Sequence, residues 1–93
     1  MKFTKIGPNK VQSDRGFVFW MKSPFQLHYS ENNHELIVPS EMMTGNTELL
    51  ASVSTIKLWK VPQGEIVNEP DKARITENIG EALKFLGVRY EFD

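Results

Sequence analysis

The chain contains no cysteine, which excludes disulfides, a cysteine nucleophile and thiolate metal ligands. Its apolar runs are too short to cross a bilayer as a helix, and the first ten residues lack the apolar stretch of a signal peptide. A small domain without disulfides is typical of a reducing compartment. We therefore expect a cytoplasmic protein without membrane contact. A length of 93 residues predicts one domain over residues 1–93, with a strand and a loop within residues 1–15.

The sequence also lacks the common catalytic motifs. It has no glycine-rich phosphate loop and no G-x-S-x-G, and no pair of carboxylates is marked out as acid and base. His28 and His34 are the only histidines, and a metal site would need a glutamate as third ligand. We therefore predict no catalytic residues, no metal site and no cofactor.

Positive charge is missing from the middle of the chain. The protein has 11 basic and 12 acidic residues, yet residues 23–56 contain no lysine or arginine, whereas residues 1–22 have a net charge of +4. The middle stretch contains four glutamates: Glu31, Glu35, Glu41 and Glu48. Sequence neighbours in a meander are neighbours in space, so this pattern predicts an acidic surface. Two interpretations remain open, a solvated edge that resists aggregation and a surface for a basic partner.

Alternating apolar residues predict the strands. They are expected at residues 3–7, 17–22, 25–30, 34–39, 49–61 (bent near Ser54) and 88–92, with loops at residues 8–16 and 40–48. Within 17–22, Phe17, Phe19 and Met21 share one face, which leaves Trp20 on the other face as a possible interface anchor.

The period changes to that of a helix from Asn68 to Leu86. Asn68 suits the N-cap and Gly87 suits the position after the C-cap. An apolar stripe is expected to pack on the sheet: Ile75, Ile79, Ala82, Leu83 and Leu86. Gly80 is unfavourable inside a helix and predicts close packing on a strand. The predicted fold class is α+β, an antiparallel sheet of five to six strands with one long C-terminal helix on one face and a short final strand.

The C-terminal part of the sequence resembles small bacterial immunity proteins of polymorphic-toxin systems, including those of contact-dependent growth inhibition. The matching residues are Ile56, Trp59 and Pro62, then Ile75, Asn78, Ile79, Ala82, Leu83, Phe85 and Gly87. The resemblance covers about residues 25–93. It implies a non-enzymatic cytoplasmic inhibitor that binds a cognate toxin C-terminal domain, with Trp59 and Pro62 as fold determinants.

Nuclease toxins have basic substrate grooves, so the acidic surface is the predicted toxin-binding site. Its candidate residues are Glu31, Glu35, Glu41, Glu48, Trp20 and His28, with Glu65, Glu69 and Asp71 as a second set. The expected protein is a monomer before complex formation and does not bind nucleic acid.

Two alternatives stay open. Residues Arg15 to Trp20, RGFVFW, resemble the aromatic strand of RNA-recognition sheets, which would make the chain a small nucleic-acid-binding β domain. Val18 departs from that motif, and the following strand is acidic. The other alternative is a small enzyme subunit or structural domain.

Overall fold

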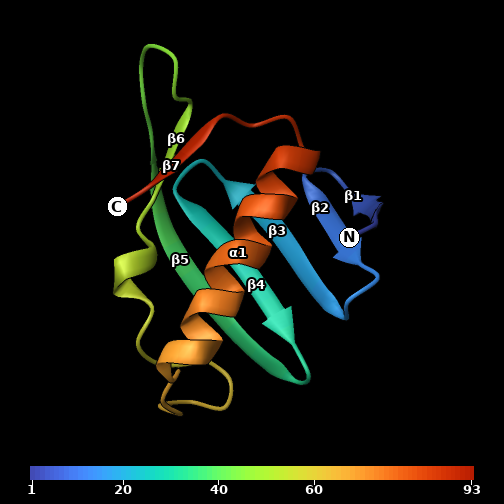
Figure 1. The fold of residues 1–93 in the computed structure, drawn as a ribbon, viewed down its shortest axis with the longest axis vertical. Helices are drawn as coiled ribbons and strands as arrows, with labels where there is room; N and C mark the ends of the chain where they lie inside the picture. The colour runs from blue at the N-terminus through green and yellow to red at the C-terminus, as the bar shows by residue number, and fades with distance from the viewer.

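One seven-stranded sheet carries a single long helix across one face (Figure 1). The computed structural model describes all of residues 1–93. The strands lie in the sheet in chain order: β1 (Phe3–Gly7), β2 (Lys10–Ser13), β3 (Phe17–Ser23), β4 (Gln26–Glu31), β5 (His34–Met42), β6 (Leu49–Ala51) and β7 (Tyr90–Phe92). A short 3-10 helix, η1 (Val53–Thr55), follows β6, and α1 (Glu69–Phe85) precedes β7. The helix is neither long nor apolar enough to cross a membrane.

The α+β class is confirmed, but the predicted strand count and pairing are wrong in two places. Residues 10–13 form β2 instead of a loop, because Asn9 adopts a positive φ and closes a tight turn after β1. The last strand runs parallel to β6, whereas β1 to β6 are antiparallel neighbours. A parallel pair requires a crossover connection, and the segment that contains α1 supplies it.

The predicted strand at residues 49–61 is also shorter than expected. Strand β6 ends at Ala51, and η1 turns the chain away from the sheet. Residues 57–67, called here the 57–67 loop, then fold back on themselves through an isolated bridge between Leu58 and Ile66, and a second bridge, between Val61 and Glu35, joins them to β5. This loop therefore lies beside the start of β5.

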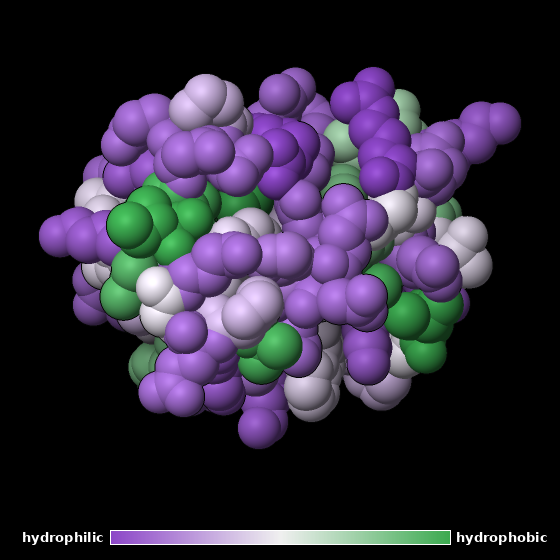
Figure 2. Space-filling view, turned by 90° about the horizontal axis from the view of Figure 1, so that it is seen from below, coloured by the Kyte–Doolittle hydropathy of each residue, from purple (hydrophilic) through white to green (hydrophobic).

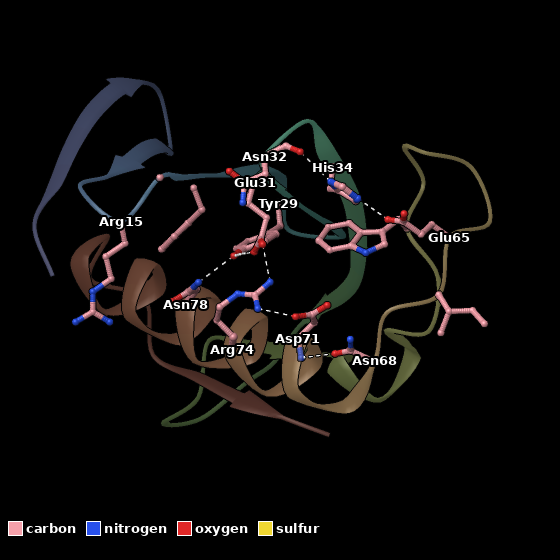
Figure 3. Close-up of a pocket in the computed structure, with 14 residues that line it drawn as sticks. Arg15, Tyr29, Glu31, Asn32, His34, Glu65, Asn68, Asp71, Arg74 and Asn78 are labelled. Atoms are coloured by element: carbon pink, nitrogen blue, oxygen red, sulfur yellow. Dashed lines mark hydrogen bonds and ion pairs between the residues drawn. The ribbon is translucent and has the colours of Figure 1, made fainter.

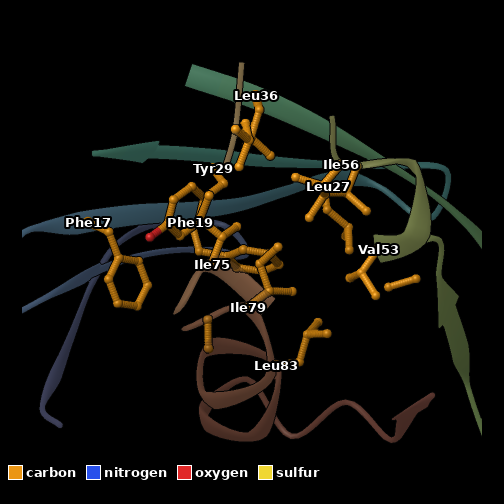
Figure 4. Close-up of a cluster of buried hydrophobic side chains, with 14 of the residues drawn as sticks. Phe17, Phe19, Leu27, Tyr29, Leu36, Val53, Ile56, Ile75, Ile79 and Leu83 are labelled. Carbon is orange, nitrogen blue, oxygen red and sulfur yellow. The ribbon is translucent and has the colours of Figure 1, made fainter. Parts of the chain in front are cut away.

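The core lies between α1 and the sheet face that it covers (Figure 4). Ile75, Ile79 and Leu83 from the helix are fully buried, as the apolar stripe predicts, and Leu86 is partly buried. The sheet contributes alternate residues, which point to one face of each strand: Val11, Phe17, Phe19, Leu27, Tyr29, Leu36 and Val38.

Local side-chain chemistry fixes both ends of α1. The side chain of Asn68 accepts a hydrogen bond from the backbone N–H of Asp71 at 2.9 Å. At the other end Gly87 has φ of +76°, and the N–H groups of Gly87 and Val88 donate to the carbonyls of Lys84 and Leu83, both at 3.0 Å. These two bonds make a Schellman motif, so the predicted helix ends are confirmed.

Gly80 marks the closest approach of α1 to β7. A Cβ atom at this position would lie 2.7 Å from the hydroxyl oxygen of Tyr90 and 3.5 Å from the Phe92 ring. The absence of a side chain therefore lets the last strand pack directly on the helix, which confirms the predicted reason for a glycine inside it.

Candidate functional site

A cleft of about 800 Å³ opens at the end of the molecule where four segments converge (Figure 3). These segments are the turn between β2 and β3, the turn between β4 and β5, the 57–67 loop and the N-terminal half of α1. The side chain of Arg15 lies at one side of the cleft and extends away from the other labelled groups. The remaining polar side chains form two separate networks.

The first network joins β4 to α1 through a buried tyrosine. The Tyr29 side chain is only 1% exposed, and its hydroxyl donates to Glu31 Oε1 at 2.5 Å. The buried amide Nδ2 of Asn78 donates to the same hydroxyl oxygen at 2.9 Å. Burial, and then the bond to Glu31, raise the pKa of Tyr29 well above its ordinary value, so this hydroxyl remains protonated.

Arg74 completes this network at the mouth of the cleft. Its guanidinium donates to Asp71 Oδ1 at 2.6 Å and to Glu31 Oε2 at 2.5 Å. The bond to Asp71, and then that to Glu31, raise the pKa of Arg74 above its usual range. One cation therefore holds two carboxylates from two elements, and the charge of the three groups together is −1.

The second network ties the 57–67 loop to the start of β5. His34 Nε2 pairs with Glu65, and its Nδ1 donates to the carbonyl of Asn32 at 2.8 Å. The His34 ring also packs edge to face on the buried ring of Trp59, with ring centroids 4.9 Å apart. The hydrogen bond to Asn32 is the main cause that raises the pKa of His34, and Glu65 adds to it.

The four glutamates of the cation-free stretch do not form one surface. Glu31 lies in the cleft and Glu35 is exposed on the sheet face opposite α1, whereas Glu41 and Glu48 lie at the opposite end of the sheet, beside the β5–β6 loop (Figure 1). Glu48 also pairs with Arg89 at 3.2 Å, and its bonds to the backbone and side chain of that residue lower its pKa. Charge segregation along the sequence is therefore only partly kept in space.

The second set of acidic candidates is brought together with Glu31. Glu65 and Asp71 line the cleft, and Glu69 is exposed at the first position of α1. Trp20 and His28, by contrast, lie on the sheet face opposite α1, with ring centroids 5.3 Å apart. These two residues thus belong to a different surface.

A model of the immunity protein 74 family matches residues 23–93. The chain belongs to this family. The match confirms the resemblance to immunity proteins of toxin systems, and it implies a toxin-neutralising role with a toxin protein as partner. No curated protein and no solved structure matches the chain. All three acidic residues of the cleft lie within the matched part of this immunity protein, whereas Arg15, Gly16 and Phe17 of its lining precede that part.

An immunity protein acts through its surface, so the exposed apolar groups near the cleft are relevant. Leu58 and Ile66 are opposite each other in the 57–67 loop and are 55% and 74% exposed. Figure 2 shows this end of the molecule as mainly hydrophilic, with separate apolar patches among the polar side chains. The surface is therefore mixed in the way that protein interfaces are.

Sequence reasoning missed the residues that organise the cleft. Asn78 gives a signal, since a polar residue inside an apolar helix stripe needs a buried partner. Arg74 gives none, because its partner Glu31 is 43 residues away. No three His, Asp or Glu side chains come close enough together to hold a metal ion.

Proposed function

We propose that the chain neutralises a nuclease-type toxin domain by covering its basic substrate groove with the cleft end of the molecule. The observation that carries this proposal is the convergence of Glu31, Glu65 and Asp71 from a strand, a loop and a helix around one opening. A nuclease holds a polyanion, so a basic groove is what such carboxylates complement.

The apolar pair beside the cleft supplies the second part of an interface. Leu58 and Ile66 are exposed in the free protein, and Ile66 also lines the cleft next to Glu65. Buried apolar contacts at the centre of an interface control dissociation, whereas surrounding charges mainly act on the association rate. We therefore assign Ile66 to holding the toxin and the carboxylates to steering it.

The ion pairs inside the cleft determine which carboxylates are useful for a test. Glu31 is bonded to Tyr29 and Arg74, so reversing its charge would disturb the fold as well as the surface. Glu69 is exposed at the start of α1, and Glu65 contacts only the half-exposed His34. These two side chains are the better probes of steering because exposed charges contribute little to stability.

The experiment measures stopped-flow association with the cognate toxin domain at low and high salt. Glu65→Lys with Glu69→Lys should slow association about tenfold or more and remove much of its salt dependence. Ile66→Asp should mainly accelerate dissociation. The matched control is Glu41→Lys with Glu91→Lys, which makes the same charge change among exposed residues away from the cleft.

Melting curves of every variant separate binding from folding. If Glu41→Lys with Glu91→Lys slows association as much as Glu65→Lys with Glu69→Lys does, the carboxylates of the cleft have no special role in steering the toxin. Unchanged association and unchanged protection of toxin-expressing cells by the Glu65 and Glu69 variant would contradict the proposal.

A further inference from the structure

The sheet face opposite α1 carries a second surface of the opposite charge. The strand register places Lys10, Trp20, His28 and Ile37 in one row across β2, β3, β4 and β5. Three strand spacings make this row about 14 Å long. The helix α1 covers the other face of the sheet (Figure 1), and on this face Ile6 of β1 and Lys60 and Val61 of the 57–67 loop lie beside the row.

The row forms the floor of a groove of about 440 Å³. Trp20 and His28 lie in its centre with ring planes inclined at 49°, and Val18, Ile37 and Val61 extend the floor on either side. A hollow of this size with an aromatic floor fits a flat ring better than a single carboxylate side chain.

Lysines surround this floor. The Nζ atom of Lys10 lies 5.2 Å from the centroid of the Trp20 ring and that of Lys22 lies 5.8 Å from it, while Lys60 lines the groove from the 57–67 loop. Glu35 is the one acidic residue of the lining. The groove is therefore positively charged, so a second copy of this face would be repelled and an anionic ligand attracted.

The properties of His28 favour one kind of anionic ligand, a nucleic acid, over another, an acidic peptide. Its Nε2 atom is buried and has no hydrogen-bond partner in the chain, and burial, followed by the charges of Lys22 and Lys60, lowers its pKa. A neutral imidazole adds a ring face but no positive charge, and its buried Nε2 is not accessible to a ligand. An acidic peptide would gain little from such a ring, whereas a nucleobase has a ring face that can stack on it.

We propose that this groove binds single-stranded nucleic acid, with bases against Trp20 and His28 and phosphates at Lys10, Lys22 and Lys60. Of the four glutamates in the acidic stretch, only Glu35 lines the groove, and the Glu31 carboxylate lies on the helix side of the sheet, where it is bonded to Arg74. This site is separate from the cleft and does not depend on the proposed toxin interface. A duplex binds poorly because its bases are stacked inside.

The experiment titrates fluorescently labelled ten-nucleotide oligo(rU) and oligo(dT) into the protein at several salt concentrations. Three phosphate contacts predict that the logarithm of the binding constant falls with the logarithm of salt concentration at a slope of about 2. Loss of one stacked base predicts binding weakened about 5- to 150-fold in Trp20→Leu. Binding should also quench Trp20 fluorescence, since the other tryptophan, Trp59, is buried.

Lys10→Gln, Lys22→Gln and Lys60→Gln together should abolish binding and leave toxin neutralisation intact. The charge-matched control changes the exposed Lys2, Lys57 and Lys84 to Gln, and the aromatic control is Phe25→Leu at an exposed turn. Both controls should bind as the wild type does. The lysine variants keep the test valid even where Trp20→Leu fails to fold.

Three results would overturn the proposal. The first is no saturable binding of either oligonucleotide at about 50 mM salt, where phosphate contacts bind more tightly than at physiological salt. The second is equal binding by the groove variants and their controls. The third is equal or tighter binding of a poly-glutamate peptide, which would assign the groove to acidic polypeptides.

Discussion

Replacing Tyr29 by phenylalanine removes one buried hydroxyl and leaves the ring in place. The ring stacks on Phe17 with centroids 5.3 Å apart, and phenylalanine retains that contact. What is lost is the bond to Glu31 at 2.5 Å and the acceptor of Asn78 Nδ2 at 2.9 Å. Glu31 keeps Arg74 as its partner, so the main cost is the buried amide group left without an acceptor.

We expect Tyr29→Phe to lower the free energy of unfolding by about 2 kcal/mol, within the range for one unsatisfied buried group plus a lost hydrogen bond. For a chain of this size, that corresponds to a melting temperature about 8–16 °C lower. Urea unfolding and thermal melting measure the effect. Tyr90→Phe is the control, because its ring is only partly buried and it should change stability by less than about 0.5 kcal/mol.

The same hydroxyl also predicts an alkaline effect. Burial and Glu31 raise the pKa of Tyr29 above the ordinary value of 10.0, so the unfolded chain loses this proton first as pH rises. The stability that the protonated hydroxyl contributes is complete below pH 10.0 and declines above it. Tyr29→Phe should flatten this decline relative to the wild type. A melting temperature within about 2 °C of wild type, together with additive effects of Tyr29→Phe and Asn78→Ala, would refute the network.

Three further predictions concern packing and titration. Gly80→Ala should destabilise the protein by about 1–3 kcal/mol, because the added methyl group overpacks against Tyr90. In a Tyr90→Phe background the same substitution should be neutral or stabilising by up to about 1 kcal/mol. Equal effects in both backgrounds, measured by urea unfolding, would contradict this contact. Ile79→Asp places a charge at a fully buried position and should prevent folding, which circular dichroism detects; a soluble variant with an unchanged melting point would disprove the burial. In NMR titration, Glu65→Gln should lower the pKa of His34, because Glu65 favours the protonated ring. An unchanged pKa of His34 would show that this ion pair does not form.

Features set by a few adjacent residues could be predicted from the sequence. The cap at Asn68, the stop at Gly87 and the buried helix stripe each depend on spacing within one or two turns, and each is confirmed. Strand β2 escaped prediction because it has only four residues and follows a turn-rich segment. The parallel entry of β7 depends on the path of the whole chain, which no local pattern contains.

The candidate site was harder to predict because its residues come from distant segments. Glu31 meets Arg74, and Glu48 meets Arg89 across 41 residues, so two glutamates of the cation-free stretch obtain their counter-charges from the C-terminal part. Composition along the chain therefore overstated the acidic surface. The register determined from Phe17 to Met21 did place Trp20 correctly on the open face, because alternation within one strand is local.

The N-terminal segment lies outside the family match, yet the core does not end where the match begins. Residues 23–93 are matched, but Val11, Phe17 and Phe19 are buried against the matched helix, and Phe3 contacts Phe85 with ring centroids 5.2 Å apart. Removing the first three strands would expose these apolar surfaces, so the matched part does not form a complete core in this chain. The same segment carries the net charge of +4 and brings two of its lysines to the open face. The N-terminal segment therefore supplies two of the three lysines at the groove, whereas the three carboxylates of the cleft come from the matched part, so the two sets of charges can be altered separately.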